Sequence, residues 1–230
     1  MKNLVVIQHT SSEYLGLIED HFEARGIRFS YFRPFAQGGG LPHRDLLGDG
    51  LVLLGGGPWG SAGTRDLPTL AEEIVLARVC LMTEKPLVGF GLGAQIVARA
   101  SDGSSESDDY RLAVQAVRRV RDDALAGLMP ARFDCAECGR DRAVPPGYAD
   151  VLAVDEEGRP AVFQVGPRAI GFAGHPGFKP AIAEDLIMEF EESPVDGANG
   201  LLALRAAKSR FEDALVPIMA GLTKVLGLGV

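Results

Sequence analysis

Short apolar runs alternate with helical periodicity in the first hundred residues of the chain. Residues 4–7 and 50–54 are continuous apolar segments, as expected for strands that are covered on both faces of a parallel sheet. After the first of them, Leu15, Ile18 and Phe22 fall on one face of a helix. Strands that alternate with helices at this spacing predict a three-layer, doubly wound α/β fold with a mostly parallel sheet.

Two pairs of residues predict where helices begin. Thr10 with Glu13, and Thr69 with Glu72, have the spacing of a capping box, in which two residues satisfy each other's backbone N–H groups at the start of a helix. Gly26 suits the position just after the end of the first helix. We therefore expect helices directly after Thr10 and Thr69.

The pattern changes after the polar stretch 101–109, which predicts a surface loop. The segments 111–117, 151–154 and 161–165 are short and are separated by proline and glycine. Such segments predict antiparallel strands that are added to the sheet. A later helix is expected to begin at Pro180, because proline suits the first helical position.

The chain length of 230 residues suits one large domain with an appendage. We expect an α/β domain over residues 1–192 and a C-terminal helical extension over residues 193–230. Leu204, Phe211 and Leu215 recur at helical spacing in this extension. The extension therefore either packs against the domain or docks a partner protein or a second copy of the chain.

Composition limits the classes of function. The chain has 47% hydrophobic and 23% charged residues, which is ordinary for a globular protein. Its formal net charge of −8 argues against nucleic-acid binding, because affinity for the phosphate backbone comes mostly from lysine and arginine. The apolar run near the N-terminus is too short for a signal peptide or a membrane span, and three cysteines do not make a disulfide framework. We expect a cytoplasmic protein that binds neither membrane nor nucleic acid.

A glycine-rich turn over residues 89–93 follows a predicted strand and leads into a predicted helix. Such a turn has two chemical interpretations. Gly89-x-Gly91-x-x-Ala94 formally fits the dinucleotide-binding fingerprint, but it does not lie in the first strand–helix unit and lacks the acidic residue expected about 20 residues later. The alternative is a nucleophile elbow, which presents a strained residue above the sheet beside a helix N-terminus.

Four motifs in order carry a family resemblance. Residues 89–95 resemble the elbow G-x-C-x-G-x-Q, and residues 53–58 resemble a glycine-glycine-proline oxyanion loop. Residues 143–148 resemble the short segment before the later strands, and residues 172–177 resemble a histidine-proline-glutamate motif. Together they resemble class I glutamine amidotransferases, particularly stand-alone members related to the glutaminase domain of guanosine-monophosphate synthase. The resemblance covers roughly residues 4–190 and implies the α/β fold of that family.

The resemblance also shows which catalytic residues differ. In the family a cysteine attacks the side-chain amide of glutamine, a histidine acts as the base and a glutamate orients the histidine, as in other triads. Here the nucleophile position is Gly91 and the acid position is Gly177, so that His175 alone is retained. Because glycine adopts positive φ without steric penalty, we expect Gly91 to keep the elbow geometry and relieve its strain.

The residues that shape the pocket are kept. The N–H groups of Gly57 and Leu92 match the oxyanion donors of the family, and Gln95 matches a residue that helps to hold the substrate. The resemblance therefore implies a pocket for glutamine or a similar small ligand, with a synthetase as a further possible partner and without cofactor or metal. The leading hypothesis is a pseudoenzyme that has lost the glutaminase reaction and binds a ligand or partner.

An active amidotransferase or hydrolase with another nucleophile is the second hypothesis, and a dinucleotide-binding protein is the third. For the second, Cys135 and Cys138 are the only thiols outside the predicted helices. As a C-x-x-C pair without a second pair or a nearby histidine, they lack the four ligands of a zinc site, which favours a structural pair of thiols over redox or intersubunit metal chemistry. Cys80 is expected to be a small buried residue, and His9 a surface histidine.

Overall fold

The computed structural model describes residues 1–229. Its strands are β1 (Asn3–Ile7), β2 (Arg28–Phe32), β3 (Gly50–Leu53), β4 (Leu87–Phe90), β5 (Ser104–Glu106), β6 (Arg111–Arg119), β7 (Arg132–Gly139), β8 (Arg142–Val144), β9 (Asp150–Val154), β10 (Pro160–Val165) and β11 (Ala169–Phe172). Its helices are α1 (Ile18–Glu23), the short 3-10 helix η1 (Arg44–Leu46), α2 (Leu70–Met82), α3 (Leu92–Ala100), α4 (Pro180–Glu189) and α5 (Gly197–Val225).

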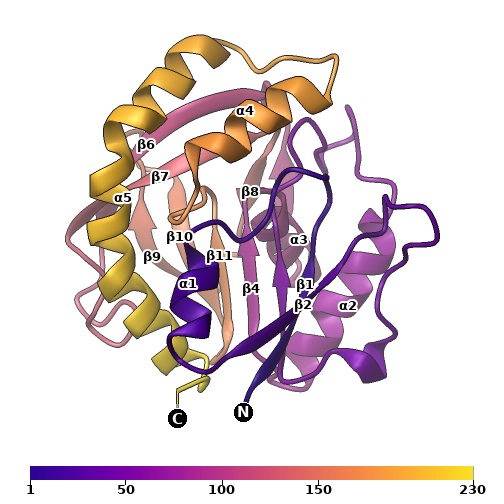
Figure 1. Cartoon of the computed structure of the whole chain (residues 1–230). Coiled ribbons are helices and arrows are strands. Elements are labelled where there is room, and N and C mark those ends of the chain that lie inside the picture. Colours follow the sequence, from indigo (N-terminus) through magenta and orange to yellow (C-terminus); the bar gives the residue numbers. More distant parts are fainter. Residues whose placement is uncertain (230) are drawn as a thin grey trace.

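A nine-stranded sheet in the order β2-β1-β3-β4-β11-β10-β9-β6-β7 forms the centre of the fold (Figure 1). The strands from β2 to β11 in this order are parallel, and those from β10 to β7 are antiparallel. The predicted α/β class and the antiparallel additions are therefore confirmed. The parallel half ends at β11, whose last residue Phe172 pairs with Phe90 at the end of β4.

Alternate residues of the buried strands face opposite layers. In β1, Val5 and Ile7 belong to the core beneath α2 and α3, whereas Leu4 and Val6 belong to the core beneath α1 and the C-terminal half of α5. The continuous apolar run of this strand is thus explained by helices on both faces of the sheet. A third cluster packs α4 and the N-terminal half of α5 against β6 and β7.

The long helix α5 buries one face against the rest of the chain, and Figure 1 shows it lying along the antiparallel half of the sheet. Leu204, Phe211 and Leu215 are all fully buried in this way, so they are not available for docking a partner. Pro180 is the first residue of α4, as predicted. None of the helices described for residues 1–229 is long and apolar enough to cross a membrane.

Neither capping box forms, although α2 begins directly after Thr69, as predicted. The hydroxyl oxygen of Thr10 does accept a hydrogen bond from the backbone N–H of Glu13, at 3.0 Å, but α1 begins only at Ile18. The side chain of Glu13 does not return to the helix start, because it is buried inside the protein. The hydroxyl of Thr69, the residue before α2, accepts no hydrogen bond from the helix backbone and instead donates to the carboxylate of Glu73 at 2.6 Å.

Three strands, β5, β7 and β8, lie where the hydrophobic pattern did not predict them. Ser104–Glu106, in the predicted surface loop, forms β5 and pairs with β8 in a small second sheet. Arg132–Gly139 forms β7 at the edge of the large sheet, where it pairs with β6 along its length. None of these segments is strongly apolar. β5 and β8 have three residues each, and β7 is only partly covered, so pairing between backbones decides their structure.

We expect α5 to contribute directly to the stability of the sheet core. Replacing the buried Leu215 by alanine leaves a cavity, and should lower the free energy of unfolding by about 2–5 kcal/mol. The neighbouring Val216 is 55% exposed, so Val216→Ala is the matched control. It should change the free energy of unfolding by no more than about 0.5 kcal/mol. Urea denaturation of the two variants measures both values. Equal effects would contradict the packing of α5 on the sheet.

Candidate functional site

The glycine turn forms the predicted corner between a strand and a helix. β4 ends at Phe90, α3 begins at Leu92, and Gly91 between them has φ +54° and ψ −113°. The N–H of Gly91 donates to the carbonyl of Phe172 at 2.9 Å, which fixes the corner to the end of β11. A Cβ added at Gly91 would meet only the Cα of Gly55, at an ordinary 3.5 Å. The corner therefore has space for a side chain, but it carries none.

Close backbone contact holds this corner in place. A Cβ at Gly93 would lie 2.1 Å from the carbonyl oxygen of Leu53, and the N–H of Gly93 donates to the carbonyl of Leu54 at 3.1 Å. The first turn of α3 thus docks directly on the end of β3. Only glycine permits this approach, which explains why the turn is rich in glycine.

His175 lies next to the corner in an apolar setting. Its backbone pairs with Ala136 of β7, and its ring stacks on Phe90 with centroids 4.8 Å apart. Phe178 covers the ring from the edge. The Nδ1 atom accepts a hydrogen bond from the N–H of Gly177 at 3.1 Å. Because burial disfavours the charged imidazolium, the pKa of His175 is lowered to about 3.

This hydrogen bond determines where the proton of His175 sits. A backbone N–H can only donate, so Nδ1 holds the lone pair and the neutral ring carries its proton on Nε2. A triad base needs the opposite arrangement, in which a carboxylate binds Nδ1–H and Nε2 is free to accept a proton. His175 is therefore present at the predicted place in a protonation state unsuited to a base.

The acid position at Gly177 is closed by packing. A Cβ there would lie 2.9 Å from the Cγ1 atom of Ile18 and 3.2 Å from the Cδ2 atom of Leu215. The carbonyl of Gly177 accepts a hydrogen bond from the N–H of Leu17 at 2.8 Å. Helices α1 and α5 thus occupy the space that a longer side chain at this position would need.

The carboxyl group of Glu13 binds the N–H of Gly57, which was predicted to be an oxyanion donor. Its Oε2 atom accepts a hydrogen bond from the N–H of Gly57 at 3.2 Å. Its Oε1 atom lies 1.8 Å from the place where a Cβ on Gly55 would stand, so the carboxyl group rests directly on the glycine loop. Burial raises the pKa of Glu13 to about 7, although the Gly57 N–H and His9 both lower it. Sequence reasoning missed this role, because the capping spacing offered a local one.

A second buried polar pair supports the same loop. Nε2 of His9 lies 2.8 Å from the carboxylate of Glu73, and Nδ1 of His9 lies 2.9 Å from the carbonyl oxygen of Gly55. Burial lowers the pKa of His9, but the Glu73 charge and these hydrogen bonds outweigh burial and raise it overall. His9 is only 3% exposed, so the expectation of a surface histidine is wrong.

Leu92 and Gln95 lie on the first turn of α3. The N–H of Leu92 stands at the first helical position, where no intrahelical acceptor exists. The amide nitrogen of Gln95 donates to the carbonyls of Arg140 and Asp141 at 2.7 and 3.2 Å, and its oxygen accepts from the Ser61 hydroxyl at 2.6 Å. Gln95 therefore holds the segment after β7 against α3.

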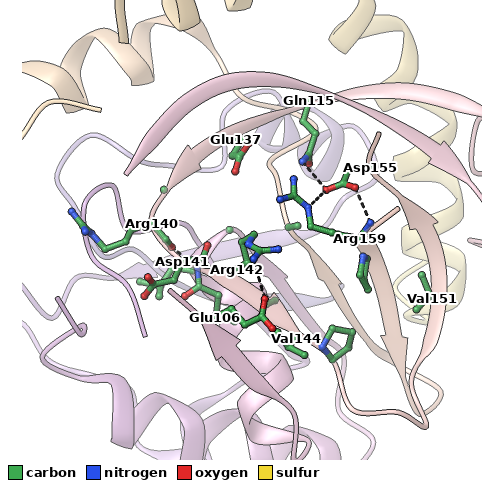
Figure 2. A pocket seen from close by; sticks show the side chains of 18 of the residues that line it. Glu106, Gln115, Glu137, Arg140, Asp141, Arg142, Val144, Val151, Asp155 and Arg159 are labelled. Atoms are coloured by element: carbon green, nitrogen blue, oxygen red, sulfur yellow. Dashed lines mark hydrogen bonds and ion pairs between the residues drawn. The ribbon is translucent and has the colours of Figure 1, made fainter. Parts of the chain in front are cut away.

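A cavity of about 340 Å³ opens beside Gly91 (Figure 2). The start of α3 forms one side of it, β7 and the segment 140–147 form another, and Asp155 and Arg159 lie across from them. The charged side chains that line it come from β5, β7, β8, the turn between β7 and β8 and the turn between β9 and β10. The cavity therefore extends from the strand-to-helix corner at Gly91 to the charged residues of the antiparallel strands.

The two thiols of β7 do not act together. Cys135 belongs to the core beneath α5, whereas Cys138 belongs to the cluster beneath α4, so the pair is divided between two core regions. Burial raises the pKa of both thiols well above the ordinary range. All three cysteines are free and buried. Among residues 1–229, no group of three metal-ligating side chains comes together.

The raised pKa of Glu13 predicts a pH-dependent stability. In the folded chain Glu13 keeps its proton up to about pH 7, whereas its ordinary pKa is 4.5, so unfolding releases a proton between these values and stability falls as pH rises. Glu13→Gln keeps an oxygen for Gly57 and removes this titration. The free energy of unfolding of the variant relative to the native chain should therefore rise by up to about 3 kcal/mol from pH 4.5 to above pH 7.

Urea denaturation across this pH range measures that difference. Glu72→Gln replaces an exposed carboxylate on α2 and controls for the loss of one negative charge. If the curves of the native chain and Glu13→Gln run parallel with pH, Glu13 does not hold a proton inside the fold.

Comparison with known proteins identifies the architecture. Neither protein-family models nor curated proteins give a match. Among solved structures, a glutamine amidotransferase from Thermotoga maritima is similar with a TM-score of 0.80 and 21% identity over 98% of each chain. One from Methylobacillus flagellatus has a TM-score of 0.80 and 20% identity, over 98% of this chain and 96% of its own.

A protein from Thermoplasma acidophilum, described as a GMP synthase component, is also similar, with a TM-score of 0.57 and 15% identity, over 91% of this chain and 98% of its own. These identities are low, and the agreement lies in the three-dimensional arrangement of the sheet and its helices. The expectation drawn from four short motifs is thereby confirmed at the level of the fold. This chain has the fold of the class I glutamine amidotransferases.

Proposed function

We propose that this protein is a glutamine amidotransferase-like pseudoenzyme that lacks glutaminase activity and binds a small ligand in the cavity beside α3. The observation that carries the proposal is the strand-to-helix corner at Gly91, which has the backbone form of a nucleophile elbow and no nucleophile. Without a side chain there, no covalent intermediate forms with the amide of glutamine.

The surroundings of the corner support the same conclusion. His175 carries its proton on Nε2, so it is a donor where the family reaction needs a base. Gly177 offers no carboxylate to reverse that arrangement. The N–H of Gly57 is already bound by Glu13, so that it is not free to stabilise an oxyanion. The base, the acid and the oxyanion donor are thus all altered in addition to the nucleophile. The loss of a single side chain would not explain this.

A replacement nucleophile is poorly supported. Cys135 and Cys138 stand one and two residues from Ala136, the residue of β7 whose backbone pairs with His175. Both thiols are buried, and their raised pKa keeps them protonated at neutral pH. For the dinucleotide hypothesis, the glycine turn follows β4 rather than the first strand, which again is not the position of that fingerprint.

The cavity is the inherited feature that supports ligand binding. Its volume of about 340 Å³ suits a molecule of the size of glutamine or a similar small compound. It reaches Gly91 and Leu92, and its wall is held by Gln95 through the carbonyls of residues 140 and 141. Binding of a synthetase partner or of a second copy of the chain stays a separate prediction. The packing of α5 does not favour it, because the apolar face of this helix is already buried.

The absence of glutaminase chemistry is tested by ammonia release. The native chain incubated with glutamine should release no more ammonia than the same solution without protein, because no group at the corner can attack the amide. A known glutaminase serves as the positive control. Turnover that scales with the concentration of the purified chain would overturn the proposal.

The vacant corner is tested by Gly91→Cys. The new side chain has room, and a thiol at the N-terminus of α3 is activated by the helix dipole, so it should react with iodoacetamide faster than the three buried native thiols. Positive φ at a non-glycine residue should cost about 1–3 kcal/mol of stability. Intact-mass analysis should show one added label on the variant and none on the native chain.

Glutaminase activity should stay absent in Gly91→Cys, since His175 and Glu13 are unchanged. The variant Gly91→Ala controls for the backbone strain without the thiol. If the introduced thiol reacts no faster than the native ones, the corner is closed and the elbow interpretation fails.

A further inference from the structure

We propose that the ligand of the cavity beside α3 is a small primary amine with a hydrocarbon body, bound through its ammonium group by the carboxylate of Glu137. This inference rests on the proposed function, because it names the chemistry of the same binding site. The observation behind this inference is that the other charged side chains on the cavity wall have a partner within the protein, whereas Glu137 has none among residues 1–229.

Glu137 is the unpaired charge on this wall. Its side chain projects from β7 into the cavity, and Figure 2 draws it without a contact to any neighbour. Within residues 1–229 its carboxylate makes no hydrogen bond and no ion pair. Burial raises its pKa, although Arg111 and Arg159 act in the opposite direction. A half-buried carboxylate that lacks a partner gains most from a ligand that carries a positive charge.

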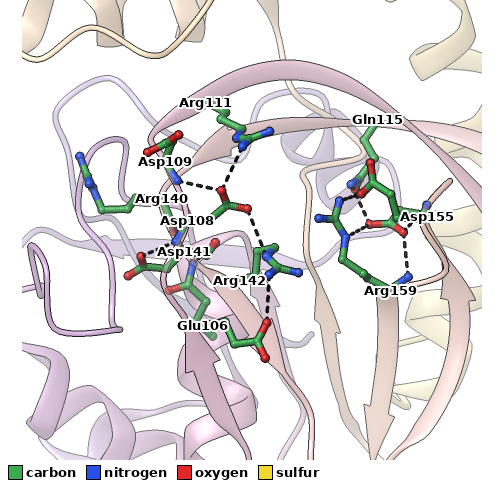
Figure 3. A network of polar contacts seen from close by, with 12 residues as sticks. Glu106, Asp108, Asp109, Arg111, Gln115, Arg140, Asp141, Arg142, Asp155 and Arg159 are labelled. Atoms are coloured by element: carbon green, nitrogen blue, oxygen red, sulfur yellow. Dashed lines mark hydrogen bonds and ion pairs between the residues drawn. The ribbon is translucent and has the colours of Figure 1, made fainter.

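The three arginines on the wall are already paired. Arg142 contacts Glu106 at 2.9 Å and Asp108 at 3.1 Å. Arg159 contacts Asp155 at 2.6 Å (Figure 3), and Arg140 pairs with Glu192. An anionic ligand would have to compete with these internal carboxylates for every guanidinium. The arrangement therefore disfavours a phosphate or carboxylate ligand.

The other two acids near Glu137 are also satisfied. Asp155 accepts hydrogen bonds from the N–H groups of Glu157 and Arg159 at 3.0 and 2.8 Å in addition to its ion pair. Asp141 accepts from the N–H groups of Ser61 and Ala62, both at 2.8 Å. Of the four carboxylates that line the cavity, Glu106 and Asp155 pair with arginine and Asp141 is bound by backbone N–H groups, whereas Glu137 has neither kind of contact within residues 1–229.

Apolar residues determine what the rest of the ligand must be. The cavity is also lined by Val144, Pro145, Pro146, Val151 and Pro160. Such a surface favours contact with methylene groups, since burial of apolar area is favourable and needs no directed partner. An ammonium group on a short hydrocarbon chain matches both parts of the cavity.

Three probes of one size and different charge test this inference: n-hexylamine, 1-hexanol and hexanoate. Titration of the full chain followed by amide NMR measures each dissociation constant and locates the binding. We expect hexylamine to bind at least about tenfold more tightly than the other two, with shifts in residues 137–147. Glu137→Gln should reduce its affinity by about tenfold or more and leave hexanol unchanged, while Glu137→Asp should keep part of the preference.

Glu156→Gln, in the exposed turn after β9, is the matched control for the loss of one charge and should bind hexylamine as the native chain does. Equal affinities for the three probes, tighter binding of hexanoate, or no effect of Glu137→Gln would each overturn the inference. Any of these results without ammonia release from glutamine would leave the pseudoenzyme proposal intact. Ammonia release would instead overturn that proposal, whatever the probes do.

Discussion

The direct contact between α3 and the ends of β3 and β4 is the constraint on which the rest of the site depends. Gly93 touches the backbone of Leu53, and Gly91 turns the chain from strand to helix with positive φ. These contacts involve backbone atoms, so they persist whatever side chain stands at the corner. The fold can therefore keep the form of a nucleophile elbow with glycine at the corner, and the cavity beside it keeps its shape.

Buried polar groups fill the places where catalysis would otherwise need free ones. Glu13 binds the Gly57 N–H, and His9 with Glu73 holds the carbonyl of Gly55. Such contacts satisfy backbone groups that would be costly to leave unpaired inside a protein. They stabilise the glycine loop in its present form, and Glu13 occupies the N–H of Gly57.

The antiparallel half of the sheet supplies what is individual to this chain. The hairpin of β6 and β7 lies across the cavity from α3, and Glu137 of β7 is the charged lining residue that has no partner among residues 1–229. The parallel half sets where a ligand can lie, whereas this half sets which chemical groups it meets. A fold shared with glutamine amidotransferases is thus compatible with a different ligand chemistry at the same edge of the sheet.

The sequence by itself determined the buried strands, the α/β class, the corner at Gly91 and the absence of a side chain there, because apolar runs, glycine spacing and residue identity are local properties. The tertiary structure decided the roles of Glu13, His9 and Gln95. Glu13 has the local spacing of a helix cap, yet its partner Gly57 comes from a loop after another strand. The tautomer of His175 and the unpaired state of Glu137 also depend on which atoms from distant segments lie beside them. Hydrogen bonds and charge pairs between elements follow from how the chain packs, and no spacing along the sequence records them.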